Sequence, residues 1–299
     1  MALSIHTNYS SLITQTNLSK TNNALGTNQQ RLGTGFRINS AADDAAGLQI
    51  ATRLNAQSRG MDVAIRNTGD SISLLQTAEG ALNEMTDIVQ RMKDLATQAA
   101  NATASEKDRD ALQAEYDQLG QELGNIVKNT KYAGENLFGD GTSTDGSGGK
   151  FSDAMDFQIG ASTAETLTLD VSTPLTDLAA ALGGLSAQYE TPDATTPGAE
   201  IAGTDGSAAN GMIDTLADAL DSIGELRAQF GANINRLNHT ANNLANMKDN
   251  TDMAKGRILD ADFAKESANM SKNSMLLQSG ISMLKQAGQM PGMVMSLLG

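Results

Sequence analysis

The stretch SLLQTAEGALNEMTDIVQRMKDLATQAA, residues 73–100, decides the fold of this chain. Its apolar residues recur with the spacing 3, 4, 3, 4, 3, 4, 3, and they are Leu75, Ala78, Leu82, Met85, Val89, Met92, Ala96 and Ala99. This spacing places one apolar stripe along an α-helix, which is the stripe that a coiled-coil partner covers. The sequence therefore predicts a long amphipathic helix, with Met85 and Met92 as packing residues rather than ligands.

A second helix is predicted directly after a short break at residues 101–105. Ser105 is a suitable N-cap, and Asp108 falls in the first turn, where a carboxylate is favourable. The apolar stripe of this helix consists of Leu112, Tyr116, Leu119, Leu123 and Ile126. Because the connection is short, we expect the two helices to pack in antiparallel orientation.

Residues 130–175 predict short strands instead of helices. Thr and Asp at 166, 168 and 170 alternate with Leu and Val at 167, 169 and 171, and Ala133 with Gly134 gives a turn signal. Residues 176–205 are rich in Ala, Gly, Thr, Pro and Asp and have weak periodicity. We expect them to form a short, variable, surface-exposed segment, helical in part at 175–182, that adds little to a core.

Helical periodicity returns at Met212 and continues to the end of the chain. Apolar residues recur every seven positions at Leu216, Ile223, Phe230, Leu237 and Leu244. After Gly256 a second stripe follows, made of Phe263, Ser267, Met270, Ser274, Leu277, Ile281 and Leu284. Near the end, Met290, Met293 and Met295 make the helix apolar on several faces, so it needs several neighbours, most simply copies of the same chain.

The N-terminal segment predicts a helix with a very narrow apolar stripe. Leu18, Leu25 and Leu32 provide one apolar residue per heptad, among many asparagines that form helices poorly. Such a helix is not stable by itself in water. Both ends of the chain are therefore predicted to be helices that need partners.

Two glycines and two aspartates interrupt the helical pattern in RLGTGFRINSAADDAAG, residues 31–47. We interpret Gly33 and Gly35 as a helix end, because glycine tolerates left-handed dihedral angles. A new helix is predicted to begin near Ser40, with Ser40 as N-cap and Asp43 and Asp44 in the first turn.

The fold class predicted from these patterns is mainly α. We expect a long antiparallel helical bundle or coiled coil built from both chain ends, with a small β-hairpin region at the far pole. The predicted domains are residues 1–44 with 256–299, residues 45–175 with 206–255, and the surface segment 176–205. The short strands belong to the second domain, at about 130–175.

Composition excludes several classes of function. The formal net charge is −14, and residues 140–210 hold eleven acidic residues against one lysine, so such a surface repels phosphate backbones and a nucleic-acid partner is not expected. No stretch approaches membrane-spanning length, and the chain has no cysteine for disulfides or thiolate metal sites. The start of the chain lacks the basic and apolar regions of a signal peptide, so we expect no cleaved signal.

No constellation of catalytic residues emerges. Gly33 and Gly35 lack the further residues of a phosphate-binding loop, and His6 and His239 do not belong to an HExxH zinc motif. Asp43 and Asp44 have no evident nucleophile beside them, and no serine sits in a GxSxG setting. We therefore expect no enzyme activity, no cofactor and no metal.

At this point the residues carry a family resemblance. RLGTGFRINSAADDAAGLQIATRL, residues 31–54, resembles the N-terminal signature of bacterial flagellins, and MALSIHTNYSSL resembles their start. The stretches NTKYAGENLF, FQIGASTAETLTLDV, ANINRLNHTANNLANM and QMPGMVMSLL are similar to further landmarks of the family, in the expected order. The resemblance covers about residues 1–175 and 206–299 and implies a short form with a reduced variable region.

The resemblance implies a filament subunit whose terminal helices form an inner tube domain, surrounded by a helical outer-core domain. Residues 33–47 are then the connector between the two domains. The residues implied in assembly and interdomain contact are Leu18, Leu25, Leu32, Arg37, Asn39, Asp43, Asp44, Phe263, Met270, Leu277, Ile281 and Leu284.

The resemblance also implies partners and a location. These are other copies of the chain in a homopolymer, the flagellar export apparatus with an export chaperone, and the filament cap and hook–filament junction proteins. The protein is then extracellular, in the flagellar filament, exported unfolded without a cleaved signal.

A host Toll-like receptor is a further candidate partner that the resemblance implies. The stretch QRMKDLATQ, residues 90–98, aligns with the family's recognised surface and places Gln90, Arg91 and Leu95 on it, with Glu115 nearby. The alternative is that Arg91 and Glu115 are ordinary solvated helix charges. Lys93 and Asp94 stand where many members carry Arg and Glu, which is a departure that bears on affinity.

Two other functions stay open at this stage. A hook–filament junction protein shares the terminal helices with flagellins, and a monomeric coiled-coil scaffold has the same helical periodicity. A flagellin with an inserted catalytic domain is excluded, because the middle segment is short and lacks HExxH.

Overall fold

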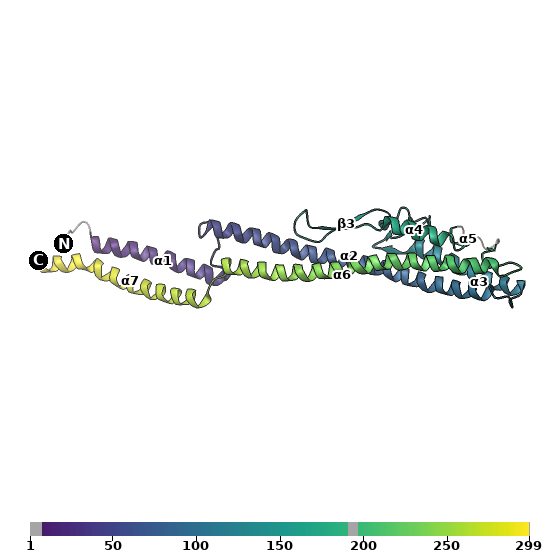
Figure 1. The fold of residues 1–299 in the computed structure, drawn as a ribbon. Coiled ribbons are helices and arrows are strands. Elements are labelled where there is room, and N and C mark those ends of the chain that lie inside the picture. Colours follow the sequence, from purple (N-terminus) through teal and green to yellow (C-terminus); the bar gives the residue numbers. More distant parts are fainter. Residues whose placement is uncertain (1–7, 191–196, 299) are drawn as a thin grey trace. The chain divides into compact units, whose positions relative to one another are not determined.

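The computed structural model describes residues 8–190 and 197–298, without the side chains of residues 290, 291 and 293–298 (Figure 1). His6 and the expected packing of Met290, Met293 and Met295 lie outside this description. Long helices dominate the fold, which confirms the mainly α class. They are α1 (Tyr9–Thr34), α2 (Ala45–Ala99), α3 (Glu106–Asn129), α6 (Ser207–Leu259) and α7 (Phe263–Leu298).

The contacts divide the chain into two compact units. Unit 1 comprises residues 1–58 and 248–299, and unit 2 comprises Arg59–Met247. Both divisions fall inside a helix, namely inside α2 and inside α6. The domain boundaries predicted at residues 44 and 256 stay predictions. The contacts divide the chain after residues 58 and 247.

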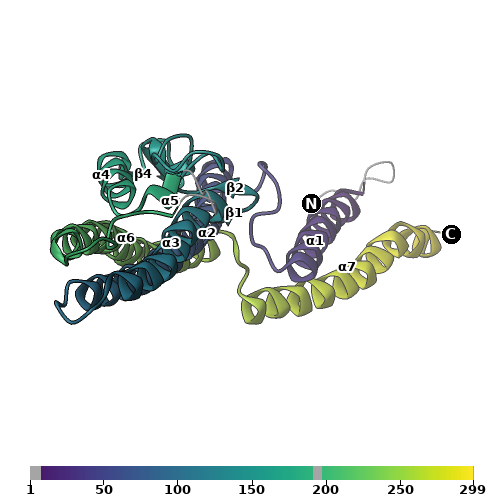
Figure 2. The ribbon, with the colours of Figure 1, turned by 90° about the vertical axis from the view of Figure 1, so that its right-hand side faces the viewer.

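The core of unit 2 is the stripe that the sequence predicts. All eight stripe residues of α2, from Leu75 to Ala99, are at most 1 % exposed. They form one cluster with Tyr116 and Leu123 of α3 and with Leu216 and Phe230 of α6. These three helices lie side by side in unit 2 in both views (Figures 1 and 2). Ser105 caps α3 in a full capping box with Asp108, as predicted.

Two small antiparallel hairpins occupy the region predicted to hold strands. Strand β1 (Lys131–Tyr132) pairs with β2 (Glu135–Asn136), and β3 (Met155–Gln158) pairs with β4 (Thr166–Leu169) with Phe157 opposite Leu167. Ala133 and Gly134 both have positive φ angles, 52° and 89°, which is what a two-residue hairpin turn of type I′ requires. A short 3-10 helix, η1 (Lys150–Ser152), lies between the hairpins.

The expectation that residues 176–205 add little core is wrong for the described part of that segment. It contains most of α4 (Ser172–Gly183) and all of α5 (Ala187–Glu190), and its buried residues in the main cluster are Leu178, Leu182, Leu185, Tyr189 and Ile201. The apolar residues of α4 recur at helical spacing within an Ala- and Gly-rich sequence. The helix expected at 175–182 is confirmed by α4, and the expectation failed on the burial of its apolar residues.

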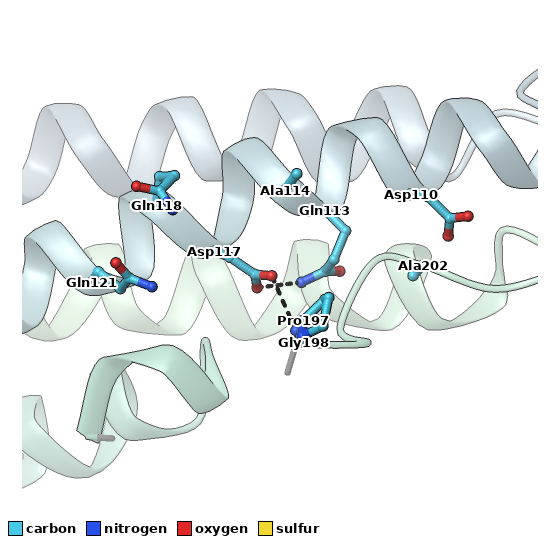
Figure 3. Close-up of a pocket in the computed structure, with 9 residues that line it drawn as sticks. All are labelled: Asp110, Gln113, Ala114, Asp117, Gln118, Gln121, Pro197, Gly198 and Ala202. Carbon is cyan, nitrogen blue, oxygen red and sulfur yellow. Dashed lines mark hydrogen bonds between the residues drawn. The ribbon is translucent and has the colours of Figure 1, made fainter. Parts of the chain in front are cut away.

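A polar face of α3 holds this segment in place (Figure 3). The amide nitrogen of Gln113 donates to Asp117 Oδ1 at 2.8 Å and to Glu200 Oε2 at 2.6 Å, and Gln113 Oε1 accepts from the backbone N–H of Ile201 at 2.8 Å. Asp117 Oδ2 accepts from the N–H of Gly198 at 3.0 Å. Beside them lies a pocket of ≈ 500 Å³ lined by α3 and by Pro197, Gly198 and Ala202. The segment is thus bound through specific side chains.

In unit 1, α1 and α7 lie side by side (Figures 1 and 2). Neither of the two hydrophobic core clusters of the described chain contains a residue of unit 1. Within the residues that the structure describes, no helix is long and apolar enough to cross a membrane.

Candidate functional site

The break between α1 and α2 pairs with the break between α6 and α7. Gly35 ends α1 with a φ of 76°, and its N–H donates to Arg31 O at 2.9 Å, which is a left-handed helix cap. The Arg37 N–H donates to Leu259 O at 2.6 Å, and the Ala261 N–H donates to Gly35 O at 2.9 Å. Arg37 also donates through its guanidinium to Ile258 O at 2.8 Å. Two chain segments far apart in sequence are therefore fixed together inside unit 1.

The prediction that Ser40 caps the next helix is wrong, because the helix begins at Ala45. Asp44 performs this role: its Oδ1 accepts from the Gly47 N–H at 2.8 Å, and its backbone oxygen accepts the first helical bond from Leu48. Gly33 lies in the last turn of α1 with an ordinary helical backbone, and only Gly35 of the two has a positive φ. The apolar periodicity did not reveal which of Ser40, Asp43 and Asp44 is the cap.

Asp43 organises the turn before the cap. Its Oδ2 accepts hydrogen bonds from the N–H of Ser40 at 2.9 Å, from the N–H of Asn39 at 3.1 Å and from the Ser40 hydroxyl at 3.0 Å. The bonds from Ser40 and Asn39 hold the pKa of the Asp43 carboxyl below its ordinary value. Asn39 in turn donates through its side-chain amide to Phe36 O at 2.8 Å.

Gly47 is required by this cap. A Cβ atom at position 47 would lie 2.5 Å from Asp44 Oδ2 and 2.9 Å from Ile38 Cδ1. Ile38 is only 3 % exposed, so it has no room to move away. The small residue therefore allows the capping carboxylate and the buried isoleucine to occupy the same side of the helix start.

The seam between α1 and α7 contains some of the predicted assembly residues and excludes others. Leu18, Leu25 and Leu32 are half-buried, as are Met270, Leu277 and Leu284. Phe263 is 58 % exposed and Ile281 is 42 % exposed, and Ser267 and Ser274 are exposed too. The predicted stripe is therefore wrong at these four positions for packing within one chain. The buried or half-buried residues of α7 up to residue 289 form its seam, and they are Glu266, Asn269, Met270, Asn273, Leu277, Gly280, Leu284 and Ala287.

A polar group in this seam was not predicted from the sequence. Arg31 Nη1 of α1 lies 3.3 Å from Glu266 Oε1 of α7, and the side chains are 27 % and 9 % exposed. Asn28 is buried one turn before Arg31. Arg31 Nε, Glu266 Oε2 and Asn28 Nδ2 are buried without a hydrogen-bond partner among the described residues. We call these three residues the polar lock, because an ion pair in a narrow seam favours one alignment of the two helices.

Unit 1 exposes most of the large apolar side chains that are exposed on the described chain. Eleven of the thirteen lie in unit 1: Tyr9, Leu12, Ile13, Phe36, Ile50, Met253, Phe263, Met275, Leu276, Ile281 and Met283. Val63 and Met247 are the two in unit 2. A soluble monomer rarely exposes this much apolar surface in one part, and such surfaces mark interaction sites.

The predicted receptor-contact residues are not all on one surface. Gln90, Arg91 and Glu115 are exposed, and Arg91 donates through Nε and Nη2 to Glu115 Oε1 at 2.8 and 2.6 Å. Leu95 is 1 % exposed within the main core, so its placement on an exposed surface is wrong. Leu95 stands one position from the stripe residue Ala96 and shares its buried side. Receptor contact by the other three stays a prediction.

Within residues 8–190 and 197–298, no three His, Asp or Glu side chains gather to hold a metal ion. His239 is exposed on α6.

The chain matches two models of one protein family. Residues 5–144 match the bacterial flagellin N-terminal helical region, and residues 213–298 match the bacterial flagellin C-terminal helical region. Flagellin A of Vibrio anguillarum is 34 % identical over 388 residues, and Flagellin A of Vibrio cholerae serotype O1 is 34 % identical over 389. Both alignments cover 100 % of each chain and are longer than this chain, so the relatives carry residues that it lacks.

Solved structures are similar in fold. A putative flagellar hook-associated protein from Vibrio parahaemolyticus has a TM-score of 0.55 and 15 % identity, covering 73 % of this chain and 100 % of its own. At that identity the likeness concerns the fold alone. The crystal structure of Bacillus cereus flagellin is 32 % identical with a TM-score of 0.47, over 60 % of this chain and 88 % of its own. The family models and the full-length relatives together show that the chain belongs to the bacterial flagellins and is a structural subunit of the flagellar filament.

Proposed function

We propose that unit 1 is the part of this subunit through which copies polymerise. The observation that carries the proposal is the distribution of apolar surface: eleven exposed large apolar side chains lie in unit 1, and both core clusters lie in unit 2. Burial of apolar surface contributes about 25 cal/mol per Å². Unit 1 gains this stabilisation only when another molecule covers it.

The same surface supports the proposed handling of the subunit before assembly. Helices with so little buried apolar surface are marginal in water, and a binding partner stabilises them by mass action. We therefore propose that the chain is exported unfolded through the flagellar export apparatus, with a chaperone covering the terminal helices. Copies then meet the filament cap and the hook–filament junction proteins outside the cell. The mature protein is proposed to retain its N-terminus, which the mass of filament-derived protein tests directly.

The polymerisation proposal is tested by changing exposed apolar residues in the full-length chain. Ile281→Gln with Met283→Gln removes two apolar side chains of unit 1 without touching the seam of α7, since both are exposed. Val63→Gln is the matched control, because Val63 is 46 % exposed in unit 2. Each chain is added to short filament seeds, and elongation is followed by electron microscopy and sedimentation.

We expect the parent and Val63→Gln chains to elongate the seeds. The unit 1 variant is expected to elongate them at least about tenfold more slowly, since it lacks two apolar side chains that polymerisation would bury. A chain without residues 1–35 and 270–299 is expected not to elongate at all. Normal elongation by the unit 1 variant would contradict the proposal. If no chain polymerises and all remain compact monomers, the scaffold function is correct instead.

A further inference from the structure

Charge is distributed very unevenly between the two units. Unit 1 holds ten Lys and Arg against seven Asp and Glu, so its formal charge is +3 and the rest of the chain carries −17. Within unit 1, the helices α1 and α7 carry mostly positive charges. The described part of α1 has no acidic residue, and α7 has Glu266 alone, which is paired with Arg31.

Four of the seven acidic residues of unit 1 gather where α6 ends and α7 begins. A groove of ≈ 780 Å³, here called the acidic groove, is lined by Asp249, Asp252, Met253, Arg257, Asp260 and Asp262, with Gly256 among them. Gly256 leaves room for Asp260, because a Cβ at position 256 would lie 2.8 Å from Asp260 Oδ2. Met253 is 54 % exposed, so the groove combines acid with apolar surface.

Two of these acids are already engaged inside the chain. Asp252 Oδ1 accepts from Lys255 Nζ at 2.8 Å and from the Ser58 hydroxyl at 2.9 Å. Asp262 Oδ1 accepts from the backbone N–H of Lys265 at 3.1 Å and thereby caps α7. Asp249 and Asp260 are exposed, and their carboxylates make no hydrogen bond or ion pair with the described residues. The groove therefore offers two carboxylates to another molecule.

The lysines of α7 are the complementary surface. Lys265, Lys272, Leu276 and Met283 are spaced 7, 4 and 7 residues apart and are all exposed, so they share one face of the helix, here called the lysine stripe. This face is separate from the seam with α1. The stripe combines ammonium groups with apolar side chains, as the acidic groove combines carboxylates with Met253.

We propose that the lysine stripe of one copy docks in the acidic groove of a second copy. This inference rests on the proposed polymerisation through unit 1 and specifies which surfaces meet. Groove against groove, or stripe against stripe, brings like charges together, which is unfavourable, whereas groove against stripe matches both charge and apolar surface. Such a contact joins two different surfaces, and heterologous contacts generate open helical polymers.

The absence of cysteine from the chain allows a direct test by disulfide trapping. Full-length Asp260→Cys and Lys272→Cys chains are mixed, polymerised on seeds and oxidised. We expect covalent dimers from the mixture and none from filaments of either variant alone. A mixture of Asp221→Cys and Lys272→Cys is the control, because Asp221 is exposed in unit 2. Equal trapping in the control, or none in the first mixture, overturns the proposal.

Charge reversal provides the second arm. Asp249→Lys with Asp260→Lys, or Lys272→Glu alone, is expected to raise the critical concentration about tenfold or more, because like charges then face each other. The chain that carries all three changes restores opposite charges between positions 249 and 260 of the groove and position 272 of the stripe, and is expected to polymerise more readily than either. Asp218→Lys with Asp221→Lys makes the same charge change in unit 2 and is expected to have no such effect.

The outcomes separate the two proposals. If the parent chain fails to polymerise, the proposed function fails. If the parent polymerises and the triple variant is as defective as the reversed chains, the pairing of groove and stripe is wrong, while polymerisation through unit 1 stands.

Discussion

At the scale of single residues, the cap of α3 makes a prediction that depends on pH. The Ser105 hydroxyl and its backbone N–H both donate to Asp108 Oδ2, at 2.7 and 2.9 Å, and these bonds lower the pKa of the Asp108 carboxyl. Because the pKa is lower in the folded chain, the ionised Asp108 carboxyl stabilises the fold at pH values above its ordinary pKa of 3.8. This stabilisation is lost as the pH falls through the pKa that the carboxyl has in the folded chain. Ser105→Ala is therefore expected to cost about 1 kcal/mol of unfolding free energy at pH 7, and less below pH 3.8.

Denaturant unfolding of unit 2 at several pH values, followed by circular dichroism, measures this difference. Thr103→Ala is the control, because Thr103 lies in the same exposed turn, and its hydroxyl makes no hydrogen bond with the described residues. A cost for Ser105→Ala that stays constant down to pH 2 would show that Asp108 does not contribute through its charge.

At the scale of elements, the polar lock determines how α1 and α7 align. Arg31→Met leaves the Glu266 carboxylate, 9 % exposed, without its cation, whereas Glu266→Met leaves an arginine that is 27 % exposed and can reach water. Both single variants are expected to lower the temperature at which filaments depolymerise, Arg31→Met more than Glu266→Met. The double variant is expected to recover most of the loss, since a matched apolar pair replaces the ions.

The recovered filaments are expected to be less uniform, because an apolar pair permits other alignments of the two helices. Electron microscopy of the double variant measures this through the spread of helical parameters. Parental depolymerisation temperatures in both single variants would mean that the ion pair has no part in the seam.

At the scale of the whole molecule, the uneven distribution of core predicts uneven stability. The thirty-three buried residues of the main cluster all belong to unit 2, while α1 and α7 bury little. Amide hydrogen exchange of the dilute monomer is therefore expected to be fast in α1 and α7 and slow in α3 and in residues 70–99 of α2. The same amides of α1 and α7 are expected to become protected in filaments. Strong protection of α1 in the dilute monomer would contradict coupled folding and assembly.

The sequence predicted the structure well where apolar residues recur at regular helical spacing. The stripe from Leu75 to Ala99, the heptads of α6 and the cap at Ser105 all follow from local spacing. It was a poor guide where polar residues are buried. Gln113 and Asp117 look like solvated helix residues, yet they are 2 % and 6 % exposed because Gly198 and Ile201 return to bind them.

Residues close together in the chain are enough to predict the mainly α class, the long helices, the hairpin turn at Ala133 and Gly134 and the family resemblance. The folded chain was needed to show that Leu95 is buried and that Arg31 meets Glu266. Each of these depends on which segments the folded chain brings together over long separations, and local spacing does not contain that information.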